Sequence, residues 1–583
     1  MLPLASLVIL LSLPATALIT PTKNLVLPPL LVGRPPGGFL RTALRTYVDE
    51  PDDSTYAAGN FTQKLDHFNA TDDRTFAQHF WHNTALLNTS LYSGRELVFL
   101  VLGGASYGSF ESVTDDSWQV VKWSEHFGAR LFRLEHRMFE RTRSSVLAAP
   151  QLEFLTTDQA VQDAVNFATT KSKDLGMVDP VWIVFGDSYS GKLAARLRAE
   201  HPNVFAAAVV SSGFVHTKKE LPEFSNAMDK LLKETLIKEQ NVTCATWLTG
   251  LVADLHQYPT NYDEDIMLEP PFSSFHRVTG QQKRHFYASV FGLMQAFMEF
   301  SYNTTDALSK KMLSTSHMCN SIVNSDDPMT KNIFFLYQWY ASLYTSANIT
   351  GFPNNYDRVV RLLKDASNNE AETDVGESIR WLWMACNEIG MFPVTDLNSI
   401  FKDFVTIDYY DVLCSDVFED RLQQIIPNSS ADYKGINTLF VHGAQDPWRA
   451  AGHLVGDDAN NVVIVDMEGM AHIGDLFTAI GIKPPSLSAA HNRIATFLDE
   501  VIENAFNPTS PTTTTLTTPK PSTILSTNAP SAIPPIPTSS IPPSTPPPTD
   551  PTTPEISTKH GSTASTFGSV IVAALATLLI CLQ

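Results

Sequence analysis

The chain has 583 residues, a formal charge of −20 at pH 7 and a pI near 5.2. So large an excess of carboxylates repels the phosphate backbone, so we expect no nucleic-acid partner. The length exceeds that of one ordinary domain, which makes the two ends of the chain the first question.

The amino terminus is a continuous apolar run with no polar face. Residues 1–17 end in Ala15-Thr16-Ala17, the small-x-small pattern that precedes signal-peptide cleavage. We therefore expect a secretory signal peptide over residues 1–17, in preference to a buried core helix. Residues 18–53 carry prolines and basic side chains without clear periodicity and are expected to form an N-terminal arm.

Residues 54–214 alternate between strand-like and helix-like segments. Several apolar runs have the composition of strands buried on both faces, which is typical of a central parallel sheet. Strands alternating with helices in this way indicate an α/β doubly wound domain. The expected strands are Gln63–Phe68, Arg74–Trp81, Leu97–Leu102, Ala129–Leu134, Val181–Phe185 and Phe205–Val210, and the main expected helix is Asp158–Thr170.

A turn of small residues, Gly186-Asp187-Ser188-Tyr189-Ser190-Gly191, joins one of these strands to a helix. In α/β-hydrolases such a turn holds a serine in a strained, exposed position from which its hydroxyl attacks a carbonyl carbon. The turn needs small residues two places on either side of the nucleophile. Gly186 and Ser190 meet this need, although glycine is usual at the second place. Ser188 is the candidate nucleophile, with an ordinary turn serine as the alternative.

The alternation of strands and helices stops at residue 215. Helical stretches such as Leu221–Glu239 and Phe286–Phe300 fill residues 215–430, and an insertion of this length is too long for a loop. We therefore expect a separate helical subdomain. It contains four cysteines, which allow three pairings in an oxidising compartment. The local pairing is favoured, namely Cys244–Cys319 with Cys386–Cys414.

Sheet signals return in residues 431–507. We expect strands at Thr438–Val441 and Val462–Val465, followed by a final amphipathic helix at Ala489–Ala505. Asp446 comes just after the first of these strands, and His472 comes just after the second. Loops at the carboxyl ends of parallel strands form the active sites of such sheets, so both side chains are candidates for catalysis.

Serine, aspartate and histidine thus occur in the chain order that α/β-hydrolases use. His472 would remove the proton of Ser188, and Asp446 would orient the imidazole and stabilise the imidazolium that forms. The backbone N–H groups of Tyr189 and Gly104 are the candidate donors for the developing oxyanion. Taken singly, Asp446 before a proline could be a turn former, and His472 is one of 16 histidines.

The C-terminal part of the chain has a different character. Residues 508–560 are rich in proline, threonine and serine, which is typical of an O-glycosylated stalk, with an unmodified linker as the alternative. Residues 561–583 combine small residues, a spacer and a short apolar tail with no basic residue after it. We expect a GPI-attachment signal there, with Gly561 or Ser562 as the attachment site, in preference to a short transmembrane anchor.

Glycosylation sequons also indicate the secretory pathway. They lie at Asn60, Asn69, Asn88, Asn241, Asn303, Asn348 and Asn428. We therefore expect a glycoprotein on the extracellular face of the plasma membrane, or one that is secreted or lysosomal.

Several short motifs together resemble the proline-specific serine carboxypeptidase family, which includes lysosomal Pro-X carboxypeptidase, dipeptidyl peptidase II and thymus-specific serine protease. The motifs are Leu65-Asp66-His67-Phe68, Arg74-Thr75-Phe76, Gly103-Gly104, Glu135-His136-Arg137, Leu155-Thr156-Thr157-Asp158-Gln159-Ala160, the serine turn, Asp446-Pro447-Trp448 and Ala471-His472. The resemblance implies that the insertion is a helical cap over the active site. It also implies a catalytic triad of Ser188, Asp446 and His472, and a proline pocket that Trp448 helps to line.

A proline pocket must recognise a rigid ring that has no backbone N–H, so it relies on apolar packing. Trp381, Trp383 and Met384 of the insertion are further candidates for its lining, with ordinary core packing as the alternative. The sequence departs from the family pattern beside the nucleophile, at Asp187 and Ser190.

The sequence therefore predicts an α/β-hydrolase that acts as a serine exopeptidase on peptides with proline near the cut. Removal of a C-terminal residue and removal of an N-terminal dipeptide both remain open. An esterase or lipase, and a non-catalytic surface module that keeps the fold, are the alternative hypotheses. No metal or cofactor is expected. The expected partners are peptide substrates, the membrane through a lipid anchor, and a second copy in a homodimer.

Overall fold

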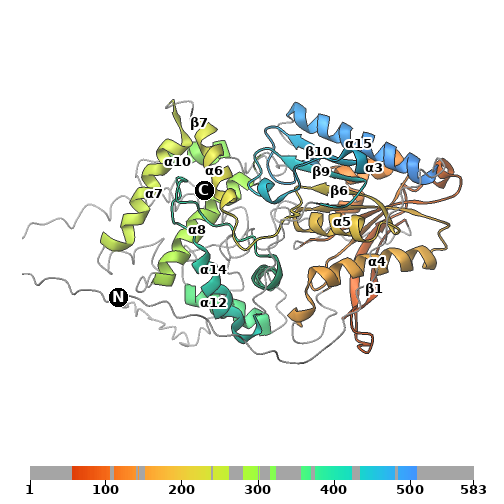
Figure 1. The fold of residues 1–583 in the computed structure, drawn as a ribbon, viewed down its shortest axis with the longest axis horizontal. Coiled ribbons are helices and arrows are strands. Elements are labelled where there is room, and N and C mark those ends of the chain that lie inside the picture. Colours follow the sequence, from red (N-terminus) through yellow and green to blue (C-terminus); the bar gives the residue numbers. More distant parts are fainter. Residues whose placement is uncertain are drawn as a thin grey trace, which may run out of the picture. The chain divides into compact units, whose positions relative to one another are not determined.

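The computed structural model describes residues 55–104, 110–139, 142, 151–237, 241–261, 280–299, 301, 315–323, 356–368, 374–422, 433–478 and 484–507 (Figure 1). The predicted signal peptide, N-terminal arm, stalk and lipid-anchor signal lie outside these residues, as do the sequons at Asn303, Asn348 and Asn428. None of the described helices has the length and apolar character that crossing a bilayer requires.

An eight-stranded sheet forms the centre of the described fold, in the order β1-β2-β4-β3-β5-β6-β9-β10. The strands are β1 (Tyr56–Lys64), β2 (Thr75–Asn83), β3 (Leu97–Leu102), β4 (Arg130–Leu134), β5 (Val181–Asp187), β6 (Phe205–Ser211), β9 (Thr438–Gly443) and β10 (Val462–Met467). β2 pairs antiparallel to both β1 and β4, and all the other neighbours pair in parallel. This arrangement confirms the predicted α/β-hydrolase fold.

The first strand lies earlier in the chain than predicted. Its pairing with β2 ends at Lys64, whereas the predicted strand continued to Phe68. The Asp66 side chain accepts the Phe68 N–H at 2.9 Å, which is an Asx turn. Local side-chain bonding therefore turns the chain where the sequence pattern still alternates.

Helices cover the sheet on both faces. They are α2 (Glu111–Thr114), α3 (Gln119–Phe127), α4 (Thr157–Asp174), α5 (Ser188–Glu200) and α15 (Pro485–Phe506), and Figure 1 shows α3 and α15 on one side and α4 and α5 on the other. Alternate residues of β3 belong to two different apolar clusters. Leu97, Phe99 and Val101 share one cluster with residues of α3 and α15. Val98, Leu100 and Leu102 share the other with residues of α4 and α5. Because successive side chains of a strand face opposite ways, a strand covered on both sides must be apolar throughout.

Between β6 and β9 the described residues are mainly helical. The elements are α6 (Pro222–Glu234), β7 (Leu236–Ile237), β8 (Val242–Thr243), α7 (Cys244–Asn261), α8 (Gly280–Glu299), α10 (Thr315–Val323), α12 (Tyr356–Asn368), α13 (Asp374–Met384), a π-helical turn η6 (Ala385–Ile389) and α14 (Ile407–Phe418). The helix predicted to reach Glu239 ends at Glu234, because β7 pairs with β8 in a short hairpin. Disulfides join Cys244 to Cys319 and Cys386 to Cys414, the pairing favoured from the sequence.

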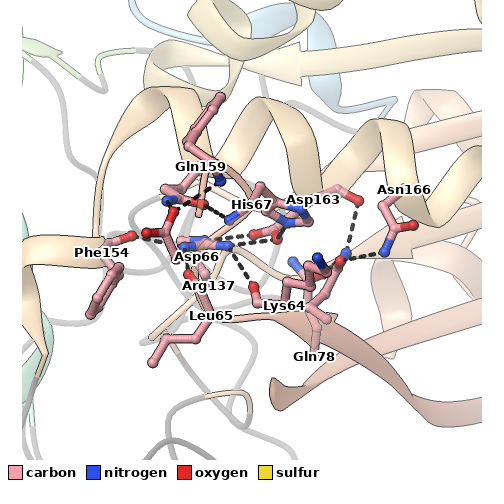
Figure 2. Close-up of polar contacts among 12 residues, drawn as sticks. Lys64, Leu65, Asp66, His67, Gln78, Arg137, Phe154, Gln159, Asp163 and Asn166 are labelled. Carbon is pink, nitrogen blue, oxygen red and sulfur yellow. Dashed lines mark hydrogen bonds and ion pairs between the residues drawn. The ribbon is translucent and has the colours of Figure 1, made fainter. Parts of the chain in front are cut away.

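A buried ion pair joins β4 and α4 to the end of β1. Arg137 and Asp163 form two hydrogen bonds, of 2.7 and 2.8 Å, and their side chains are 0% and 1% exposed. His67 Nε2 lies 2.8 Å from the same carboxylate. The remaining Arg137 N–H groups donate to the backbone carbonyl oxygens of Lys64, Leu65 and Phe154 (Figure 2). All five guanidinium donors are therefore used, so several of the family-like motifs form one structural cluster.

Candidate active site

Ser188 lies at the junction of β5 and α5, where the chain passes directly from strand to helix. Its φ of 51° is in the left-handed region, where a residue with a side chain is strained. Two glycines permit this turn. A Cβ atom at Gly186 would collide with the backbone carbonyl of Ser190, and one at Gly191 would lie 2.7 Å from the Cα atom of Gly213. These are the features of a nucleophile elbow.

The two departures from the family pattern beside Ser188 are hydrogen-bonded partners. Asp187 is the N-cap of α5, and its side chain accepts the backbone N–H of Ser190. In return the Ser190 hydroxyl oxygen accepts the Asp187 N–H at 2.9 Å. This is a reciprocal capping box, with serine where glutamate is usual. Ser190 is fully buried, so it supplies both the small volume that the turn requires and part of the helix cap.

We expect the substitution Ser190→Ala to lower the free energy of unfolding by about 1 kcal/mol, because the Asp187 N–H loses its acceptor. The alanine methyl group still fits the turn, so the fold should persist. Urea unfolding of the purified protein measures the change. An unfolding midpoint equal to that of the wild type would contradict the role of this capping box.

Asp446 and His472 follow the adjacent parallel strands β9 and β10, and the structure brings their side chains together. His472 Nδ1 lies 2.8 Å from Asp446 Oδ2, and both side chains are buried. Burial by itself would lower the pKa of His472, but the charge and hydrogen bond of Asp446 raise that pKa above its usual value. Because Nδ1 is committed to Asp446, proton exchange with a hydroxyl group would use Nε2.

The loop that carries His472 is fixed from the end of β6. The Ile473 N–H donates to the Ser212 hydroxyl oxygen at 2.9 Å, and Ile473 itself has a φ of 51°. The buried Asp475 carboxyl group accepts a hydrogen bond from the Ser211 hydroxyl. Burial raises the pKa of Asp475 to about 6, against the opposing effect of this hydrogen bond. These contacts set the backbone from which the imidazole projects.

The two predicted oxyanion donors lie next to the serine turn. Tyr189 belongs to the first turn of α5, and its hydroxyl lies 3.2 Å from His136 Nε2. Gly104 follows β3, and a Cβ atom there would lie 3.7 Å from the Ser190 side chain. The end of β3 therefore packs against the start of α5. The chain that follows Gly104, residues 105–109, lies outside the described residues.

The aromatic residues predicted to line a proline pocket occupy different environments. Trp448 is partly buried, and its ring lies 4.8 Å from that of Phe224 on α6. Trp381 is also partly buried, with its ring 5.7 Å from the Tyr189 ring. In contrast, Met384 has no exposed surface, and Trp383 is 5% exposed. Trp383 and Met384 are thus buried in the apolar core of the insertion, whereas Trp448 and Trp381 keep exposed surface.

The four described sequon asparagines are all exposed, as attachment of a glycan requires. They are Asn60, Asn69, Asn88 and Asn241. Asn88 also caps a short 3₁₀-helix, where its side chain accepts the Ser90 N–H at 3.2 Å.

One residue of the site was missed from the sequence. Glu299, the last residue of α8, is 3% exposed, and its backbone carbonyl oxygen accepts the His472 N–H at 2.9 Å. Its carboxyl group accepts a hydrogen bond from the Gln295 amide at 2.8 Å, and the Trp448 side chain acts to lower its pKa. No motif marks this position. The only available signal was a carboxylate at the end of the mainly apolar second half of a helix.

Known proteins resemble the chain over most of its length. The Caenorhabditis elegans protein F56F10.1 is 27% identical over 80% of this chain and 89% of its own. Mouse thymus-specific serine protease is 23% identical over 67% of this chain and 77% of its own, and mouse lysosomal Pro-X carboxypeptidase is 23% identical over 74% and 86%. Among solved structures, a proline iminopeptidase from Mycobacterium smegmatis aligns with a TM-score of 0.33 and 10% identity, covering 76% of this chain and 98% of that one.

Residues 63–494 match the family described as serine carboxypeptidase S28. The match begins at the end of β1 and continues into α15, so it includes the serine turn, the insertion and both loops that carry Asp446 and His472. The chain therefore belongs to the serine carboxypeptidase S28 family.

Proposed function

We propose that the protein is a serine exopeptidase that cleaves peptides near proline, with Ser188, His472 and Asp446 as its triad. The observation that carries this proposal is the buried contact of 2.8 Å between His472 Nδ1 and Asp446 Oδ2, beside a sheet that also presents Ser188 at a strained turn. Membership of a serine peptidase family gives this geometry its chemical meaning.

In the proposed reaction, the Ser188 oxygen attacks the scissile carbonyl carbon while its proton moves to His472 Nε2. Asp446 stabilises the imidazolium, and the backbone N–H groups of Tyr189 and Gly104 stabilise the oxyanion. Collapse of the tetrahedral intermediate breaks the C–N bond, and the imidazolium gives its proton to the leaving amine. Water then hydrolyses the acyl-enzyme by the same steps in reverse, with His472 again as the base.

The proline preference rests on the chemistry of Trp448 and on one relative. Trp448 lies two residues after Asp446, and its backbone N–H donates to the catalytic carboxylate at 2.9 Å, so its indole is held close to the triad. A flat apolar surface suits the proline ring. The name of the Pro-X carboxypeptidase supports the same substrate class. Carboxypeptidase action and dipeptidyl peptidase action remain the two modes to be distinguished.

We further propose that residues 54–214 and 431–507 form the catalytic domain, and that residues 215–430 form a cap over it. The two disulfides and the exposed sequons support a protein that matures in the secretory pathway. Attachment to the extracellular face of the membrane through Gly561 or Ser562 completes the proposal. Release from cells by phosphatidylinositol-specific phospholipase tests the anchor, and persistence at the membrane after treatment would contradict it.

A fluorophosphonate probe followed by a panel of peptides tests the activity. We expect the purified ectodomain to react with the probe and to cleave peptides with proline beside the scissile bond, but not matched peptides with alanine there. Blocking the N terminus of a substrate will stop a dipeptidyl peptidase, and amidating the C terminus will stop a carboxypeptidase. Turnover of esters without peptide cleavage would support the esterase hypothesis, and no reaction with the probe would support a non-catalytic module.

A further inference from the structure

Glu299 connects the insertion to both of the loops that carry the proposed catalytic residues. Its backbone carbonyl oxygen accepts the N–H of His472, in the loop after β10. Its carboxyl group also lies near the side chain of Trp448, in the loop after β9, which acts to lower the pKa of Glu299. Trp448 in turn donates its backbone N–H to Asp446 at 2.9 Å. One residue of α8 therefore bonds the backbone of the proposed base and lies near the residue that bonds the orienting carboxylate.

The Glu299 carboxyl group is out of reach of bulk water, since the residue is 3% exposed. Its hydrogen-bond partner is the neutral Gln295 amide, and no arginine or lysine among the described residues belongs to the groups that act most strongly on its charge. Burial raises the pKa of Glu299 to about 7, whereas the proximity of His472 acts to lower it. In the other direction, the charge of Glu299 adds to that of Asp446 in raising the pKa of His472.

We propose that Glu299 is a positioning residue for His472, which fixes the catalytic loop through its carbonyl oxygen and places a buried carboxyl group near the imidazole. This inference rests on the proposed function for its catalytic meaning. It assigns to the insertion a part in the chemistry of the triad, in addition to covering it. Because a residue of the insertion acts on the base, His472 is held in place only when the insertion packs against the catalytic loop.

The direction of the pH effect follows from the charges around the two side chains. Among the described residues, the other main ionisable groups that act on His472 or Glu299 are Asp446, Asp187 and Asp475, all of them carboxyl groups. Above about pH 7 the Glu299 carboxylate is charged and stabilises the imidazolium; as the pH falls through that value it takes up a proton and this contribution is lost. Glu299→Gln removes the contribution at every pH, so His472 should lose its proton at a lower pH.

The direct test is the titration of His472 by NMR in protein labelled at the histidine Cε1 position. The Ser188→Ala background prevents turnover, and loss of the signal in His472→Gln identifies it. We expect Glu299→Gln to lower the titration midpoint of His472 by about one pH unit, the size expected for a buried carboxylate nearby. Glutamine has nearly the same shape and its carbonyl oxygen can still accept the Gln295 hydrogen bond, so the fold should be retained, and melting curves check this. An unchanged midpoint in folded protein would overturn the proposal.

Two further variants strengthen the test. Gln295→Met removes one hydrogen bond from the ionised carboxyl group, so Glu299 holds its proton to higher pH. The His472 midpoint should then fall, as in Glu299→Gln, but by a smaller amount. If one of the two variants does not fold, an unchanged His472 midpoint in the other overturns the proposal. Glu388→Gln is the matched control, because Glu388 is a second cap carboxyl with a raised pKa due to burial, but it bonds the Thr157 N–H. A His472 shift as large in this control would also count against Glu299.

Enzyme kinetics provide the second readout. In the Glu299→Gln enzyme we expect the acid limb of kcat/KM against pH to move to lower pH, and kcat on the plateau to fall about tenfold while KM changes little. A lower kcat with an unmoved acid limb would indicate a purely structural role. The NMR titration needs no turnover, so it tests the role of Glu299 whether or not the enzyme is active. Failure of the wild type to react with fluorophosphonate would instead overturn the proposed function.

Discussion

Ser188→Ala protein is expected to show no reaction with a fluorophosphonate probe and to lose peptidase activity by about 10⁴-fold or more. The reason is that this substitution removes the only atom proposed to form the acyl-enzyme bond. The methyl group of alanine can occupy the same turn, so the protein should keep its melting temperature. Probe labelling on a gel and turnover of a proline peptide measure the two effects.

A second serine on the same turn provides the control. Ser190→Ala removes a hydroxyl group two residues away, and this hydroxyl is occupied with Asp187 in the capping box. We expect this variant to retain probe labelling, although more slowly if the turn loosens. Labelling that survives in Ser188→Ala and disappears in Ser190→Ala would identify Ser190 as the nucleophile and would contradict the proposed triad.

The largest expected effect on stability is that of Asp163→Asn, which should lower the free energy of unfolding by about 3–5 kcal/mol. Burial by itself would raise the pKa of Asp163, but the charge and hydrogen bonds of Arg137, together with His67, lower it. The carboxylate is therefore the form that the fold requires. An uncharged asparagine leaves the fully buried Arg137 guanidinium without its counter-ion, and water cannot replace it.

Asp158→Asn is the matched control for this experiment. It is the same substitution on the same helix, but Asp158 is 63% exposed and pairs with Arg196 at 2.7 Å on the surface. Such a pair contributes little, and we expect a change of about 1 kcal/mol or less. Urea unfolding of both variants beside the wild type provides the comparison. Equal losses in the two variants would show that the Arg137 cluster does not have the structural role assigned to it.

The sequence was sufficient for the central fold because the relevant pattern is local. The run Leu97–Leu102 is apolar at every position, and the structure shows why, since its alternate side chains pack into two different clusters. The turn at Gly186–Gly191 is likewise defined within a few residues, by volume and by the left-handed backbone at Ser188. Strand ends were less predictable, as at Lys64, because a side chain bonding to a nearby backbone N–H decides where the pattern stops.

The sequence by itself thus determined the fold class, the order of the candidate catalytic residues and the small-residue turn, because each depends on neighbours in the chain. Only the tertiary structure decided what Asp187 and Ser190 do for each other, and that Trp383 and Met384 belong to the core of the insertion. Only the tertiary structure brought in Glu299. Its hydrogen-bond partner His472 lies far along the chain, and a bond between such distant residues has no spacing that a motif could record.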